Sequence, residues 1–131
     1  MFFKKSVQID SHIDTLVGHD TQIQGNMHFA GGLRVDGQIA GNVIEKREHP
    51  STLIISENGA ITGAVEASKI VLNGTIRGPV KSSVFIELQN KARIEGDLYY
   101  KSLEMHTGAV IEGKLVYLGE QPAEVAPSDE A

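Results

Sequence analysis

The sequence of 131 residues contains no cysteine and no tryptophan, with only four phenylalanines and three tyrosines. The lack of cysteine excludes disulfide bonds, thiolate catalysis and cysteine-ligated metal sites. No apolar run approaches the ~20 residues that a membrane-spanning helix needs. The first residues lack the apolar core and the cleavage site of a secretory signal, so we expect a cytoplasmic protein.

Basic residues are outnumbered by acidic ones: the chain has 12 Lys and Arg against 17 Asp and Glu, which gives a net charge of −5. The segment GEQPAEVAPSDEA, residues 119–131, carries four acidic and no basic residues, which leaves the rest of the chain nearly neutral. Without a basic surface, nucleic acid is not an expected partner. The acidic, proline-containing composition of residues 119–131 predicts a disordered tail. A solubilising role is its simplest interpretation, and binding of a partner is the alternative.

Glycine, by contrast, is abundant, and six of the 14 glycines stand in a repeated unit, Ile-x-Gly-x-(Met/Val/Leu). The units are IQGNM at 23, IAGNV at 39, ITGAV at 61, IRGPV at 76, IEGDL at 94 and IEGKL at 111. Their intervals are 16, 22, 15, 18 and 17 residues. Repetition with a period near 17 is typical of a stacked solenoid. No apolar stripe with a period of 3.6 residues indicates a helix.

Apolar pairs precede the later five units, and they alternate with polar residues as in strands. The pairs are Leu33/Val35, Leu53/Ile55, Ile70/Leu72, Ile86/Leu88 and Leu103/Met105. Turn signals such as Asp36-Gly37 and Asn73-Gly74 lie between the strands. Short strands joined by tight turns, with about 17 residues per circuit, predict an all-β fold, a parallel β-helix whose coils stack at ~4.8 Å.

A β-helix of six to seven such coils divides the chain into three segments. Residues 1–13 form an N-terminal tail, residues 14–118 form the β-helix, and residues 119–131 form the acidic tail. The stacking predicts one column of six isoleucines and a second column of Met27, Val43, Val65, Val80, Leu98 and Leu115. The charged segment EKREHP, residues 45–50, accounts for the long interval of 22 residues and is expected to be a solvated loop, with a docking site as the alternative.

Neither end of this β-helix has a capping helix in the sequence. The terminal coils would therefore expose apolar ladders and unpaired strand edges, which favour association. Open ends on both sides of one molecule predict a filament. The residues expected at the contacts are Leu16, Val17, Leu115, Val116, Tyr117 and Leu118. The alternative is that the tails fold back and cap the ends.

The Ile-x-Gly ladder and the run TQIQGNMHFAGGLRVDGQIAGNV resemble the bactofilins, bacterial cytoskeletal proteins that form polymers. The resemblance implies a right-handed β-helix that assembles end to end into non-polar filaments without nucleotide, cofactor or metal. It also implies a scaffold at the inner face of the cytoplasmic membrane that positions cell-wall enzymes and affects cell shape.

The first five residues, Met1, Phe2, Phe3, Lys4 and Lys5, predict a weak peripheral membrane anchor. Partly burying two phenylalanines and placing two lysines near anionic lipid is worth roughly 5 kcal/mol, a dissociation constant of about 0.1–1 mM. A filament would display many copies and bind as one multivalent object. Some bactofilins are thought to use a similar peptide. An arbitrary start followed by a linker is the alternative.

We find no sequence motif for catalysis. Phosphate-binding loops are missing, and the five histidines are scattered. Glu95 and Glu112 share one motif position and should stack, but the flat wall of a small β-helix offers no catalytic cleft. A left-handed β-helix acyltransferase would require intervals near multiples of six, and only the interval of 18 fits. A β-solenoid adaptor that does not polymerise remains the other alternative.

Overall fold

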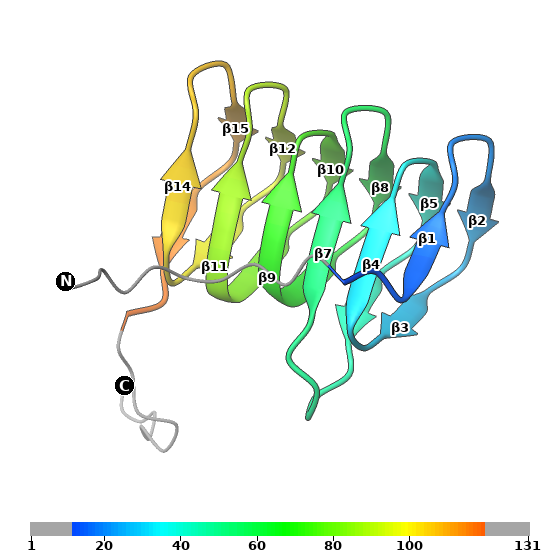
Figure 1. Ribbon diagram of the computed structural model, residues 1–131. Coiled ribbons are helices and arrows are strands. Elements are labelled where there is room, and N and C mark those ends of the chain that lie inside the picture. Colours follow the sequence, from blue (N-terminus) through cyan, green and yellow to red (C-terminus); the bar gives the residue numbers. More distant parts are fainter. Residues whose placement is uncertain (1–11, 120–131) are drawn as a thin grey trace, which may run out of the picture.

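The computed structural model describes residues 12–119, in which every regular element is a β-strand and every strand pair is parallel (Figure 1). The 16 strands wind into six stacked coils, in a right-handed sense. The predicted right-handed parallel β-helix is therefore confirmed, at the lower of the two expected coil counts. The N-terminal residues 1–11 and the tail residues 120–131 lie outside the described range.

Each coil has three sides, and we name the faces by the order in which the chain builds them. The first face comprises β1 (Thr15–Val17), β4 (Gly32–Val35), β7 (Thr52–Ile55), the second half of β9 (Val65–Leu72), the second half of β11 (Val80–Leu88) and β14 (Leu103–Met105). The second face comprises β2 (Gln22–Gln24), β5 (Gln38–Ala40), β8 (Ala60–Thr62), β10 (Thr75–Arg77), β12 (Arg93–Glu95) and β15 (Val110–Glu112).

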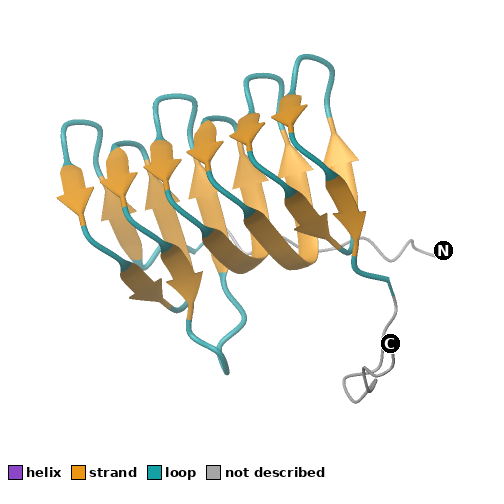
Figure 2. Cartoon of the chain, turned by 180° about the vertical axis from the view of Figure 1, so that it is seen from behind, coloured by secondary structure: helices purple, strands orange, loops and turns teal. Residues whose placement is uncertain are grey.

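The third face closes each coil and leads into the next one. It comprises β3 (Met27–Phe29), β6 (Val43–Glu45), the first halves of β9 and β11, β13 (Leu98–Tyr100) and β16 (Leu115–Tyr117). Figure 2 shows the second-face strands running through short connections into the third face. Because β9 and β11 each bend around a corner, the third and first faces form one continuous sheet.

The interior consists of the apolar columns that the repeat predicts. Ile23, Ile39, Ile61, Ile76, Ile94 and Ile111 are register partners along the second face. Met27, Val43, Val65, Val80, Leu98 and Leu115 are register partners along the third face. The predicted apolar pairs point inward from the first face in two adjacent columns. Members of these columns in the middle coils are fully buried, whereas those of the terminal coils are not.

The long interval of the repeat corresponds to the loop of residues 46–50 between β6 and β7, which projects beyond the coils (Figure 1). The carboxylate of Glu45 holds the base of this loop. It accepts hydrogen bonds from the backbone N–H of Ser51 at 3.0 Å and of Ser68 at 2.9 Å, and from the Ser68 hydroxyl at 2.8 Å. The excursion therefore leaves the coil without disturbing the stacking of the coils on either side.

Candidate assembly surfaces

The C-terminal end of the β-helix is an apolar surface. Leu115 continues the column of Val80 and Leu98, which are fully buried, yet Leu115 itself is 50% exposed. Tyr117 and Met105, which also belong to inward columns, are 58% and 45% exposed. These side chains are accessible because no further coil covers them. Among the described residues, the three strands of this coil also pair on one side only.

The N-terminal end has a different character. Its inward columns end in Thr15, Val17, Ile23, Met27 and Phe29. Val17 and Phe29 are only 3% and 5% exposed. This end therefore shows less apolar surface than the C-terminal end, although β1, β2 and β3 likewise pair on one side only.

The predicted filament-contact residues fall into four environments. Leu115 and Tyr117 lie at the C-terminal end, where they continue inward columns. Val116 and Leu16 instead belong to outward columns, on the third and first face respectively, and Val17 is buried. Leu118 lies beside the third face. The five residues Met1–Lys5 predicted to bind membrane lie outside the described range.

The second face carries a ladder of ion pairs on its outer surface. Glu95 and Glu112 are register partners, as the sequence predicts. Arg93 bridges them, with Nε 3.0 Å from Glu95 and Nη2 2.7 Å from Glu112, and Arg77 lies 3.4 Å from Glu95. The hydrogen bond to Glu95 and the attraction of Glu112 raise the pKa of Arg93. The repeat position did not reveal Arg93, because it lies in the neighbouring outward column.

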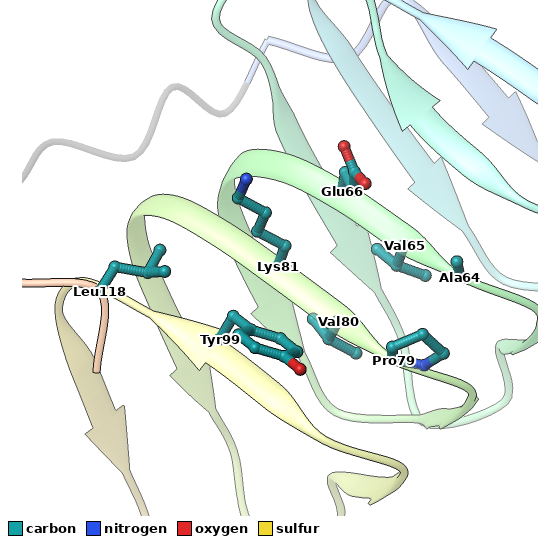
Figure 3. Close-up of a pocket in the computed structure, with 8 residues that line it drawn as sticks. All are labelled: Ala64, Val65, Glu66, Pro79, Val80, Lys81, Tyr99 and Leu118. Atoms are coloured by element: carbon teal, nitrogen blue, oxygen red, sulfur yellow. The ribbon is translucent and has the colours of Figure 1, made fainter. Parts of the chain in front are cut away.

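The third face is hollowed by a groove of about 260 Å³ (Figure 3). Its lining residues are Ala64, Val65, Glu66, Pro79, Val80, Lys81, Tyr99 and Leu118. Glu66 and Lys81 are register partners on β9 and β11, and both are exposed. No ion pair or hydrogen bond engages either side chain within residues 12–119. The groove thus combines apolar walls with two uncompensated charges of opposite sign.

One cluster in the described part of the chain has donor atoms close enough to share a metal ion, namely Glu87, Glu104 and His106. The imidazole Nε2 of His106 lies 3.0 Å from Glu87 and 3.1 Å from Glu104. Two stacked carboxylates within hydrogen-bond distance of one partly exposed imidazole are an ordinary set of polar contacts on a protein surface. In the same stretch of chain, no helix is long and apolar enough to cross a membrane.

Within residues 12–119, exposed apolar side chains on inward columns and edge strands at both ends are features of a protein that associates with copies of itself, and comparison with known proteins agrees. Residues 15–116 match the model of the bactofilin family, described as polymer-forming cytoskeletal. The chain belongs to the bactofilin family. The match spans all six coils of this bactofilin, so the whole β-helix is the family domain.

Two relatives illustrate the similarity. Bactofilin BacP of Myxococcus xanthus is 26% identical over 125 residues, which are 92% of this chain and 50% of the relative. This bactofilin thus spans about half the length of that curated relative. A cryo-EM reconstruction of Thermus thermophilus bactofilin double helical filaments superimposes with a TM-score of 0.60 at 29% identity, covering 79% of this chain and 98% of that one.

Proposed function

We propose that this bactofilin assembles end to end into non-polar filaments without nucleotide, and that the filaments form a scaffold at the inner face of the cytoplasmic membrane. There they would position cell-wall enzymes and influence cell shape, as the family resemblance implies. The observation that carries the end-to-end contact is the exposure of Met105, Leu115 and Tyr117 on inward columns at the last coil. A second molecule on this end would continue both the core and the strand ladders.

The energy for assembly comes from burial and strand pairing, so no nucleotide hydrolysis is required. Covering a half-exposed Met105, Leu115 or Tyr117 is worth about 1 kcal/mol each, and a contact between two identical ends doubles this gain. A two-fold contact between two C-terminal ends buries the most exposed apolar surface of both molecules. A head-to-tail contact would place that surface against the N-terminal end, where Val17 and Phe29 are already buried. This difference supports a non-polar filament, in which like ends meet.

The test is electron microscopy of the purified protein without nucleotide or metal, beside the variant Leu115→Arg/Tyr117→Arg. The parent is expected to form long filaments and the variant small particles, because two buried charges at the contact would be unpaired. Val84→Arg is the matched control. It adds one arginine at a residue that is 39% exposed and lies in β11, the strand next to the last coil, but not on the end surface itself, and it should leave the filaments intact.

Filaments from Leu115→Arg/Tyr117→Arg that equal those of the parent would contradict the proposed contact at the C-terminal end. Small particles from the parent itself would contradict polymerisation and favour a monomeric adaptor. Circular dichroism of both variants is the control that the β-helix still folds after the substitutions.

A further inference from the structure

The outer surface of the third face has four central side chains that are complementary to their own reversed order about the middle of the molecule. From the first coil to the sixth, its central outward column reads His28, Ile44, Glu66, Lys81, Tyr99 and Val116. The midpoint lies between Glu66 and Lys81, on the third and fourth of six coils. The pairs of residues equally far from this midpoint are Glu66 and Lys81, then Ile44 and Tyr99, then His28 and Val116.

We propose that two molecules pair in antiparallel orientation through their third faces, about a two-fold axis parallel to the strands and midway between the third and fourth coils. This axis places each coil opposite its counterpart counted from the other end. Glu66 of one copy then faces Lys81 of the other, and Ile44 faces Tyr99. Each contact occurs twice, as in any interface between identical surfaces. The proposal describes the side-by-side contact of two filament strands and so rests on the proposed function.

The charges on this face are available for such a contact. Glu66 and Lys81 are ladder neighbours, yet neither forms an ion pair within the described part of the chain. Both line the groove, together with the apolar walls of Pro79 and Tyr99 (Figure 3). A second copy would therefore neutralise two exposed charges and cover apolar surface in one step.

On the other two faces, the charges that could match a second copy are already engaged within the same chain. On the second face, Arg93 and Arg77 are already paired with glutamates of the same chain. On the first face, the central outward pairs, Ile54 with Val71 and Arg34 with Glu87, would also match in an antiparallel copy, but Glu87 already lies 3.0 Å from His106. Arg34 of this face is also paired already, with Asp36 at 2.9 Å. Within residues 12–119, only the third face combines such matching with central charges that no ion pair engages.

The double helical filaments of the Thermus thermophilus relative show that side-by-side contacts between bactofilin strands occur. End-to-end docking leaves the lateral faces free, so a second strand must use one of them. An antiparallel lateral contact fits a strand in which successive molecules alternate in direction. The loop of residues 46–50 leaves at the corner between the third and first faces, beyond the strand ladder (Figure 1). Its Arg47 lines a hollow together with Glu66 and Lys81, so the loop borders the central column and a second copy must fit beside it.

Disulfide trapping tests the orientation, because the natural chain has no cysteine. Ile44→Cys and Tyr99→Cys are prepared separately, mixed and oxidised. Within one molecule the two positions are three ladder steps apart, ~14 Å, beyond the reach of a disulfide. The mixture is expected to give covalent dimers containing one chain of each variant, and either variant alone should stay monomeric on a denaturing gel. Dimers from Ile44→Cys alone would indicate parallel pairing, and no dimers from the mixture would exclude contact. Either result overturns the proposal.

Charge reversal tests the same contact in the filament. Glu66→Lys and Lys81→Glu, each alone, are expected to reduce paired strands to single strands of half the width in electron micrographs. The double exchange Glu66→Lys/Lys81→Glu should restore pairing, because the complementarity is regained. Glu57→Lys and Lys91→Glu, at exposed turns, are matched controls. Strands that stay paired in both single variants would overturn the lateral contact, whereas a parent without any filament would overturn the proposed function.

Discussion

At the scale of single residues, the corner glycines carry the tightest constraint in the fold. Gly78 has φ +152, a value that side-chain-bearing residues rarely adopt. A Cβ at this position would meet the carbonyl oxygen of Gly63 in the preceding coil. The backbone N–H of Gly78 meanwhile donates to the carbonyl of Glu95 at 3.0 Å in the following coil. Glycine is therefore required both by conformation and by the close approach of the stacked coils.

We predict that Gly78→Ala destabilises the β-helix by about 3 kcal/mol, because backbone strain adds to a steric clash that the coils cannot relieve. Gly25 is the matched control, since it occupies the same column at φ +130 but has nothing within 4 Å of a Cβ. Gly25→Ala should cost about 1 kcal/mol, from the backbone conformation alone. Urea unfolding followed by circular dichroism measures both. Equal losses in the two variants would show that the clash contributes nothing.

At the scale of elements, the first strand depends on a side chain just before it. β1 pairs on one side only, with β4. Asp14 strengthens this attachment, because its backbone N–H donates to the Gly32 carbonyl at 2.8 Å and its carboxylate accepts the Gly32 N–H at 2.8 Å. The hydrogen bond from Gly32 lowers the pKa of Asp14, with a further contribution from His12. The ionised carboxylate thus belongs to the folded first coil.

This pKa shift predicts how the first coil responds to acid. Since the pKa of Asp14 is lower in the folded than in the unfolded chain, its contribution to stability is present above the ordinary value of 3.8 and is lost as the pH falls through the folded pKa. Asp14→Asn should therefore lower protection of β1 amides against hydrogen exchange at pH 7. The difference in amide protection between Asp14→Asn and the parent should vanish once the pH is below the folded pKa of Asp14. Asp20→Asn, at a nearby exposed turn, is the control. A difference in amide protection that stays the same at every pH would contradict the stabilising role given to the ionised carboxylate of Asp14.

The elements also show what sequence reasoning reaches and where it stops. Each Ile-x-Gly unit supplies one strand and one corner, so the isoleucine column and the burial of Ile76 followed from spacing alone. The orientation of Leu16 did not follow, because a shift of one residue reverses the side that a strand presents. The bridge by Arg93 did not follow either, because it depends on how side chains of different coils meet. The column around Glu66 and Lys81 comes one residue after each repeat unit, so the repeat does align it, but only the structure shows that these two charges are in no ion pair within residues 12–119.

At the scale of the whole molecule, assembly and membrane binding are coupled in the proposed function. One N-terminal peptide, MFFKK, supplies roughly 5 kcal/mol, so a single molecule would bind lipid with a dissociation constant of about 0.1–1 mM. A filament presents this peptide at every subunit, and each further contact becomes intramolecular once the first has formed. In the proposed function, binding at micromolar protein would therefore require the polymer as well as the peptide.

Two variants separate these requirements in a vesicle flotation experiment with anionic lipid. Leu115→Arg/Tyr117→Arg keeps the peptide but removes the end contact, and Phe2→Ser/Phe3→Ser keeps the end contact but removes the apolar side chains of the peptide. We predict that the parent floats with the vesicles and that both variants stay at the bottom of the gradient. The Phe2→Ser/Phe3→Ser variant should still form filaments, which shows that its loss is confined to lipid binding. Flotation of the end variant to the same extent as the parent would mean that single molecules bind tightly, and avidity would then have no part in membrane attachment.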